Sequence, residues 1–194
     1  MRSISKEDLN NLPIRRYEGR VSLVETPREL EQAREDIRQE RVIGLDTETR
    51  PSFRKGEVHL PCLVQAATGQ AVYLFQLNRL DVFPALVELL AKPGIIKTGV
   101  GLAYDLRQLQ QVFPFTVENV VDLGVVARRR SLGQTGVRNL AGMLLGFRIP
   151  KGNRTSNWAA PRLSPAQINY AATDAWACRE LYLKFETLGL LGAG

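Results

Sequence analysis

The sequence predicts one α/β domain in which α-helices flank a mixed central β-sheet. Its 194 residues are enough for a single domain with a sizeable core. Two apolar runs separated only by Gly69-Gln70 predict a β-hairpin, whose strands are antiparallel. Helical and strand patterns then alternate along the chain, which is typical of parallel strands joined by helices. A sheet that contains both kinds of strand pairing accounts for these observations.

Six short segments carry strand patterns. Residues 20–25 alternate polar and apolar side chains, as in a half-buried strand, and residues 42–47 form the apolar run VIGLDT, which is typical of a buried strand. The expected strands are residues 20–25, 42–47, 62–68, 71–75, 95–98 and 119–121. The stretch 50–61 is polar and bounded by prolines, so we expect a loop there.

The beginnings of the expected helices are marked by capping residues. Thr26-Pro27 and Ser164-Pro165 each supply an N-cap hydroxyl followed by a proline in the first turn, and Asp122 supplies an N-cap carboxylate. The expected helices are residues 26–40, 82–91, 102–112, 122–130, 137–145 and 164–188. We expect residues 1–19 to be a loosely held N-terminal arm and residues 20–194 to be the folded domain.

The composition is ordinary for a globular protein, with 44% apolar and 24% charged residues. No apolar run approaches the roughly 20 residues that a membrane span needs. The N-terminus lacks the apolar segment of a secretory signal. Cys62 and Cys178 lie in apolar runs, so we expect two buried, reduced thiols in a cytoplasmic protein that has no membrane partner.

The formal net charge of +6 comes from one part of the chain. Residues 1–41 hold nine basic and nine acidic side chains, whereas residues 42–194 hold seventeen basic and eleven acidic ones. A basic main body favours a polyanionic partner such as nucleic acid. A solvated basic surface without such a partner explains the charge equally well.

Two carboxylates, Asp46 and Glu48, lie at the end of an apolar strand. Residues two apart in a strand point to the same side, so both carboxylates face one way and Thr47 faces the other. Adjacent carboxylates repel each other without a cation, and their hard oxygen ligands suit a divalent ion. Asp105 follows another expected strand, at the start of a helix. Taken singly, the pair also fits a strand-terminal turn, and Asp105 fits favourable placement near a helix N-terminus.

The last expected helix adds a tyrosine and a fourth carboxylate. Tyr170 and Asp174 are four residues apart, so they share one helix face about 6 Å apart along the axis. The alanines around them allow the helix to approach the sheet closely. By themselves the two residues equally fit a half-buried tyrosine and a capping or solvated acid. Together with the three earlier acids they make a set suited to a two-metal phosphodiester site.

Three stretches of the sequence resemble the motifs of the DEDD superfamily of 3′–5′ exonucleases, tyrosine subgroup. IGLDTET resembles the first exonuclease motif, KTGVGLAYDLRQL the second and NYAATDAWACRELY the third. The resemblance is greatest to ribonuclease D and Werner-type exonuclease domains, and it covers roughly residues 20–190. It implies a ribonuclease H-like fold and two divalent ions, Mg²⁺ or Mn²⁺, as cofactors. The related histidine subgroup has a histidine where this chain has Asn169, so the histidine mechanism is excluded.

The resemblance implies a role for each of five residues. Asp46, Glu48 and Asp174 would hold the ion that binds the attacking water. Asp46 and Asp105 would hold the second ion, and Tyr170 would position the water. The implied activity is hydrolysis of phosphodiester bonds from the 3′ end of single-stranded or frayed DNA or RNA, with release of nucleoside 5′-monophosphates. The alternative is a non-catalytic nucleic-acid-binding module on the same fold.

Four further residues are expected to contact the nucleic acid. Lys151 and Arg154 belong to a long polar loop at 148–163, whose counterpart in the family lies near the active site. Leu102 resembles a family residue that wedges against the terminal base, and Thr47, between two of the acids, completes the set. Trp158 in the polar loop is expected to pack against the last helix. The sequence leaves the oligomeric state open.

Overall fold

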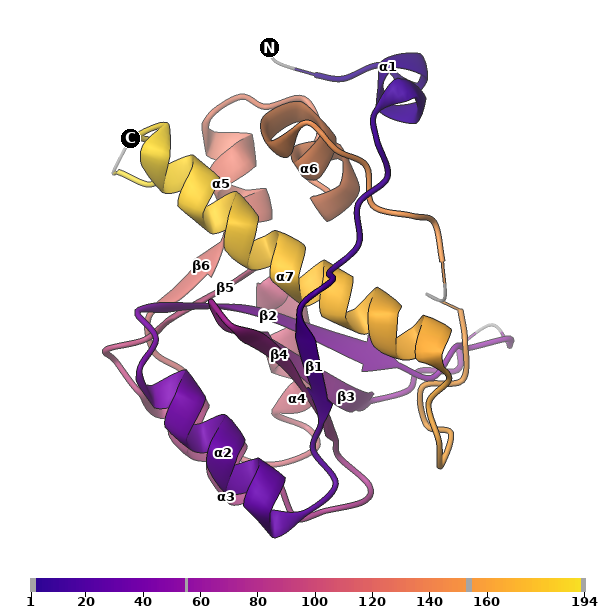
Figure 1. The fold of residues 1–194 in the computed structure, drawn as a ribbon, viewed down its shortest axis with the longest axis vertical. Coiled ribbons are helices and arrows are strands. Elements are labelled where there is room, and N and C mark those ends of the chain that lie inside the picture. Colours follow the sequence, from indigo (N-terminus) through magenta and orange to yellow (C-terminus); the bar gives the residue numbers. More distant parts are fainter. Residues whose placement is uncertain (1–2, 55, 153–154, 193–194) are drawn as a thin grey trace.

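Six strands form one mixed sheet in the order β1-β4-β3-β2-β5-β6 in a computed structural model that describes residues 3–54, 56–152 and 155–192 (Figure 1). The strands are β1 (Arg20–Leu23), β2 (Val42–Thr49), β3 (Pro61–Ala67), β4 (Ala71–Gln76), β5 (Ile96–Gly99) and β6 (Val120–Asp122). The middle strands β2, β3 and β4 pair antiparallel. β1 runs parallel to β4, and β5 runs parallel to both β2 and β6. The predicted α/β fold with a mixed sheet is confirmed.

Helices cover both faces of this sheet. They are α1 (Lys6–Asn11), α2 (Pro27–Arg38), α3 (Phe83–Ala91), α4 (Leu102–Leu109), α5 (Leu123–Arg129), α6 (Val137–Leu145) and α7 (Pro165–Thr187). In Figure 1 the long helix α7 crosses one face, whereas α2 and α3 lie against the other. The predicted caps are confirmed, because Thr26 and Ser164 each form a capping box and Asp122 accepts two N–H groups at the start of α5.

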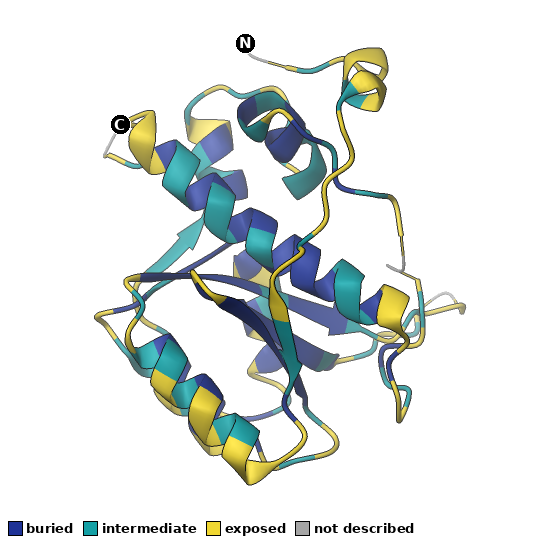
Figure 2. Ribbon diagram, viewed as in Figure 1, coloured by how far each residue is buried: buried dark blue, intermediate teal, exposed yellow. Residues whose placement is uncertain are grey.

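The core has a layer on each side of the sheet, as the burial pattern along the strands shows (Figure 2). In β3, Val64 and Ala66 pack toward α2, α3 and α4, whereas Leu63 and Ala67 pack toward α7. β4 is buried along its whole length, because helices cover it from both sides. A third cluster joins α5 and α6 to the C-terminal half of α7.

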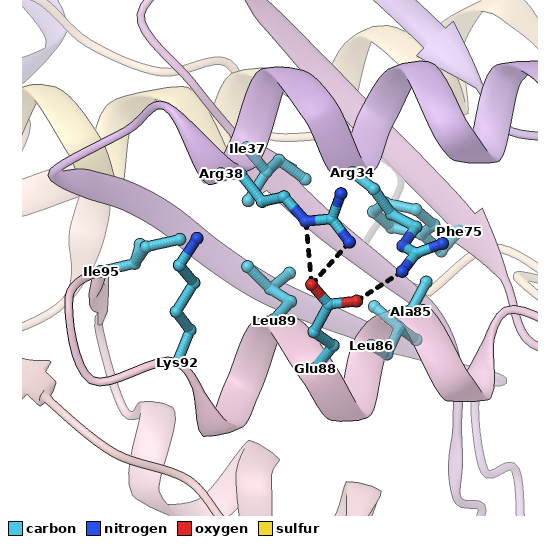
Figure 3. A pocket seen from close by; sticks show the side chains of 10 residues that line it. All are labelled: Arg34, Ile37, Arg38, Phe75, Ala85, Leu86, Glu88, Leu89, Lys92 and Ile95. Carbon is cyan, nitrogen blue, oxygen red and sulfur yellow. Dashed lines mark hydrogen bonds and ion pairs between the residues drawn. The ribbon is translucent and has the colours of Figure 1, made fainter.

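A shallow hollow lies between α2 and α3 (Figure 3). Arg34 and Arg38 of α2 both pair with Glu88 of α3, with N–O distances of 2.6 and 2.8 Å. These charges lie over an apolar floor that includes Ile37 and Leu89. The hollow holds about 20 Å³, which is room for a single water molecule. It is therefore a packing feature of the two helices and no ligand site.

The N-terminal arm is fastened to the domain rather than loosely held. Ile4 exchanges two hydrogen bonds with the Gln134 side chain, at 3.2 and 3.1 Å. The N–H of Arg15 donates to the carbonyl of Arg148 at 3.0 Å. The N–H of Tyr17 donates to the Thr173 hydroxyl of α7, also at 3.0 Å. The sequence analysis missed α1, because KEDLNN has no apolar periodicity, although Ser5 caps this short helix by accepting the N–H of Asp8.

Both cysteines are free thiols, as predicted. Cys178 is buried, whereas Cys62 is only half-buried. Burial raises the pKa of Cys62 to about 11, so this thiol stays protonated at neutral pH. None of the described helices is long and apolar enough to cross a membrane.

Candidate active site

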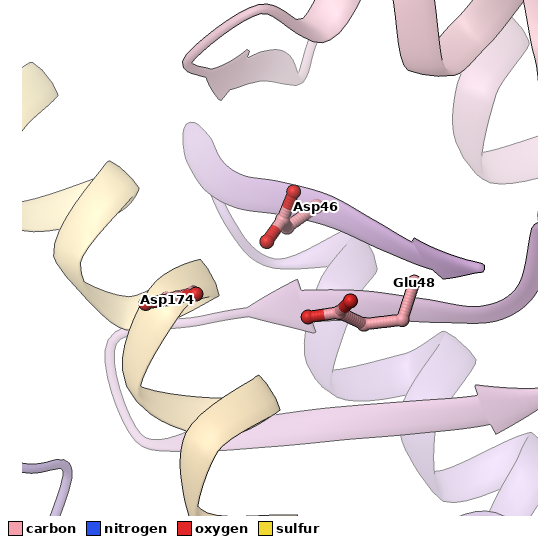
Figure 4. Close-up of side chains that lie close together, drawn as sticks. All are labelled: Asp46, Glu48 and Asp174. Carbon is pink, nitrogen blue, oxygen red and sulfur yellow. The ribbon is translucent and has the colours of Figure 1, made fainter. Parts of the chain in front are cut away.

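Three carboxylates converge between β2 and α7 (Figure 4). Asp46 and Glu48 extend from β2, and Asp174 lies on α7. One oxygen from each lies within 4.8 Å of an oxygen of the other two. Glu48 is 8% exposed and Asp174 is 7% exposed, so much of this charge lies inside the protein. Buried carboxylates this close together form a group that can hold a metal ion.

Small residues allow α7 to lie this close to β2. A Cβ atom on Gly44 would collide with the carbonyl oxygen of Ala175 and lie 2.8 Å from the backbone nitrogen of Arg179. On the helix side, Ala171 and Ala172 are fully buried against the sheet. The close approach predicted from the alanines therefore depends equally on the glycine in β2. This approach is what brings Asp174 to the carboxylates of the strand.

Asp105 reaches the same cleft from α4. This helix begins at Gly101, whose φ of +78° is a left-handed conformation that favours glycine. The N–H of Gly101 donates to Asp122 at 3.2 Å, which ties the start of α4 to the cap of α5. Asp105 then lines the cleft beside Asp46, but it lies outside the group of three carboxylates. The structure thus brings all four predicted acids to one cleft, three of them in close contact.

The charges of the site oppose one another. Burial raises the pKa of Asp46 well above its ordinary value, and the charges of Asp174 and Asp105 raise it further. Burial also raises the pKa of Asp105 to about 6. It raises that of Asp174 to about 6 as well, although the nearby Tyr170 hydroxyl and the Arg138 guanidinium act in the opposite direction. A divalent cation among these oxygens would relieve the repulsion, so the donor set fits such an ion.

Tyr170 lies one turn before Asp174 and is held from two sides. Its ring packs against the fully buried Trp158, with 5.9 Å between ring centroids, which confirms the predicted packing of Trp158 against α7. On another side the loop passes so close that a Cβ on Gly152 would lie 3.0 Å from the tyrosine ring. Burial raises the pKa of Tyr170, and the neighbouring carboxylates add to this rise. The hydroxyl therefore stays protonated and available to donate a hydrogen bond.

Of the four residues predicted to contact the substrate, the structure places two at the cleft and one in the core, and the fourth is not described. Thr47 and Lys151 line the cleft with the carboxylates. Arg154 lies outside the described residues. Leu102 is 1% exposed and packs in the core with Leu106, so its side chain does not face the cleft as expected. The first turn of α4 points this leucine inward, because the apolar face of the helix covers the sheet.

The cleft has a volume of about 930 Å³ and contains cations that the sequence did not identify. Arg138 of α6 and Lys6 of α1 both line it. Neither residue belongs to a motif, and neither α1 nor α6 is near the carboxylates in sequence. Only the tertiary arrangement identifies them, so no local signal was available.

The mixed sheet has the ribonuclease H-like fold of solved exonuclease domains, and an acidic cluster lies at its cleft. A sequence model of the family described as 3′–5′ exonuclease matches residues 21–189, and the chain belongs to this family.

Among its relatives is the bifunctional 3′–5′ exonuclease/ATP-dependent helicase WRN of Mus musculus, which is 33% identical over 154 residues. Another is ribonuclease D of Haemophilus influenzae, 32% identical over 147 residues. These matches cover 76% and 74% of this chain but only 11% and 36% of the relatives. The solved Nibbler EXO domain of Aedes aegypti shows the fold, with a TM-score of 0.78 at 24% identity over 90% of this chain and 91% of that one.

Proposed function

We propose that this protein is a metal-dependent 3′–5′ exonuclease. It would hydrolyse phosphodiester bonds at the 3′ end of single-stranded or frayed DNA or RNA and release nucleoside 5′-monophosphates. The observation that carries the proposal is the meeting of Asp46, Glu48 and Asp174 within 4.8 Å, in a chain of the 3′–5′ exonuclease family. The positive net charge of +6 supports a nucleic acid as the substrate.

Two divalent ions, Mg²⁺ or Mn²⁺, are the proposed cofactors. Asp46, Glu48 and Asp174 would hold one ion, and Asp46 and Asp105 would hold the other. When bound, such ions supply an activated water and stabilise the leaving 3′-oxygen. Burial raises the pKa values of Asp105 and Asp174 to about 6 each, which supports a site whose charged carboxylates are poorly solvated without a cation.

The protein's own groups would orient the reactants. The Tyr170 hydroxyl keeps its proton, so it acts as a hydrogen-bond donor that positions the attacking water rather than as a base. Trp158 and Gly152 hold its ring in place. Lys151 is exposed at the cleft, where its ammonium group would bind a phosphate of the substrate. Thr47 lines the cleft between the two acids of β2 and would contact the terminal nucleotide.

The test is cleavage of 5′-labelled single-stranded DNA and RNA of equal sequence, each with Mg²⁺, Mn²⁺ or EDTA. We expect a ladder that shortens from the 3′ end only when a divalent ion is present. Asp46→Asn is expected to lower the rate about 10³-fold, because several kcal/mol of metal-dependent stabilisation are lost. Asp81→Asn removes an exposed carboxylate before α3 and should leave the rate unchanged.

Two results would overturn the proposal. One is equal cleavage by the wild type and Asp46→Asn, which would exclude the assigned site. The other is retained binding of both strands without cleavage in any metal, which would support a binding module on the same fold.

A further inference from the structure

We propose that α1 and α6 form a wall that carries the phosphate backbone of the substrate away from the carboxylates. Lys6 of α1 and Arg138 of α6 are its phosphate contacts. This inference rests on the proposed function, because it assigns a path to the strand whose 3′ end would occupy the site. We call this surface the α1–α6 wall and define it by Ile4, Ser5, Lys6, Leu9, Gln134 and Arg138.

The helix α1 and the residues that flank it pack closely against α6. A Cβ on Gly142 of α6 would lie 2.5 Å from the Leu9 side chain, 3.3 Å from Ile4 and 3.4 Å from Leu12. Gly142 therefore leaves the space that these apolar side chains fill. The two hydrogen bonds between Ile4 and Gln134 fix the arm beside the segment that precedes α6. Lys6 is thus held at a defined place, although it lies on a short helix.

The wall and the carboxylates border one continuous cleft. Lys6 and Arg138 line it together with Asp46, Glu48 and Asp174. Its volume of about 930 Å³ is near the upper end of the range for small-molecule sites, about 300–1,000 Å³, which leaves room beyond a terminal nucleotide. The family match begins at residue 21, so α1 lies before the matched residues.

The charge of the wall suits a phosphate backbone. Among the described residues, neither Lys6 nor Arg138 forms an ion pair within 4.0 Å. Some arginines of other surfaces are paired, as Arg41 is with Glu186 at 2.7 Å. The acidic residues that line the cleft are the four at the proposed metal site, Asp46, Glu48, Asp105 and Asp174. No ion pair among the described residues holds either cation, although the charge of Arg138 also acts on Asp174, so both cations are available to phosphates next to that site.

The experiment measures binding of fluorescent oligo-dT and oligo-U of twelve nucleotides, in the Asp46→Asn background so that the strand is not degraded. Lys6→Gln and Arg138→Gln each remove one charge from the wall. Arg28→Gln removes one charge from an exposed position on α2, away from the cleft, and is the matched control. Each wall variant should flatten the slope of log K against log salt by about 0.7, which corresponds to about fivefold weaker binding at 0.1 M salt. Arg28→Gln should change neither quantity.

A second measurement uses the active protein without the Asp46 substitution. Lys6→Gln should raise KM for the twelve-nucleotide strand several-fold and leave kcat unchanged, because Lys6 would contact the strand away from the reacting atoms. A thermal melt confirms folding, which the exposed position of Lys6 favours. If the wild type cleaves but Lys6→Gln and Arg138→Gln bind and cleave the strand as Arg28→Gln does, the α1–α6 wall is overturned and the proposed function is not. Absence of any metal-dependent cleavage by the wild type would overturn the proposed function. The binding assay would then still show whether the α1–α6 wall contacts nucleic acid.

Discussion

At the scale of single residues, the site combines burial with like charge. Glu48 and Asp174 are almost covered by protein, and Asp46 and Asp105 carry their charges to the same cleft. An arrangement of this kind is costly for the isolated protein, because each carboxylate loses solvation and repels the others. The use that we propose for this arrangement is the binding of cations, and the binding of both ions and protons should reflect the burial and the repulsion.

Proton competition gives the first prediction. Asp105 and Asp174 have pKa values of about 6, raised mainly by burial, and a divalent ion requires their charged forms. Lowering the pH through 6 should therefore weaken ion binding, by up to about tenfold per pH unit for each proton displaced. Calorimetric titration with Mn²⁺ between pH 5 and 8 measures this. Asp174→Asn should show a shallower dependence of Mn²⁺ affinity on pH. A wild-type Mn²⁺ affinity that does not change between pH 5 and pH 7 would contradict the prediction.

Tyr170 gives the second prediction. Tyr170→Phe removes the hydroxyl but keeps the ring that packs on Trp158, so the fold and the carboxylates should be undisturbed. We expect kcat to fall about 10²-fold, the usual cost of losing a group that aligns a reactant, while Mn²⁺ affinity changes little. Single-turnover cleavage and metal titration on the same preparation test this. An unchanged kcat would remove Tyr170 from the chemistry.

At the scale of secondary-structure elements, the site depends on how β2 meets α7. The strand presents Gly44 where the helix backbone passes, and the helix presents alanines to the strand. No side chain separates the two elements at this point. The distance between Asp46 and Asp174 is therefore set by backbone contact, which cannot adjust by rotating a side chain.

Gly44→Ala tests this contact. The new methyl group would meet the carbonyl of Ala175 and the backbone nitrogen of Arg179, so α7 must shift. We expect a loss of about 1–3 kcal/mol in the free energy of unfolding, together with a loss of cleavage even where the variant is folded. Gly94→Ala is the control, because a Cβ at Gly94 meets no atom within 4 Å. Denaturant melts and cleavage assays measure both effects. Equal stability and rates for the two variants would contradict the prediction.

Local signals predicted most elements, and the failures are those that depend on distant partners. Thr26 and Ser164 fixed the starts of two helices, because capping is a property of neighbouring residues. β2 continues two residues past its expected end at Thr47, because its pairing with β3 extends to Thr49 and Pro61. The parallel pairing of β1 with β4 is equally invisible locally, since it joins residues 20–23 to residues 71–74.

Within the site, too, some features follow from neighbouring residues and others depend on residues that are distant in the sequence. Asp46 with Glu48, and Tyr170 with Asp174, are pairs whose shared faces follow from strand and helix periodicity. That the two pairs meet depends on the backbone approach at Gly44, which the sequence indicated only through the alanines of the helix. Leu102 was misplaced, because a resemblance in sequence does not define which way the first turn of a helix faces. Lys6 and Arg138 reach the cleft only through tertiary packing.

At the scale of the whole molecule, stability and ion binding should be linked. An ion that binds only the folded state stabilises it by about 2.7 kcal/mol at 100 times its dissociation constant. For a domain of this size, that corresponds to a rise in Tm of about 5–10 °C. Thermal melts in EDTA and in saturating Mg²⁺ or Mn²⁺ measure the rise.

Asp46→Asn should abolish this rise and also melt higher than the wild type in EDTA, because one charge of the repelling cluster is gone. Asp81→Asn, outside the cluster, should show the same ion-dependent rise in Tm as the wild type. A wild-type Tm that is the same with and without the ions would count against a metal site in this cleft.

The order in which the chain is synthesised gives the position of α7 a further meaning. β2 leaves the ribosome early with Asp46 and Glu48, whereas Tyr170 and Asp174 follow only with the helix at Pro165–Thr187. The proposed site therefore stays incomplete until this helix has been synthesised and docks against Gly44. A nascent chain that has not yet reached this helix would be unable to degrade RNA, including the messenger to which it is tethered. Ribosome-arrested chains that stop before residue 165 should accordingly show no cleavage, and an active one would exclude this timing.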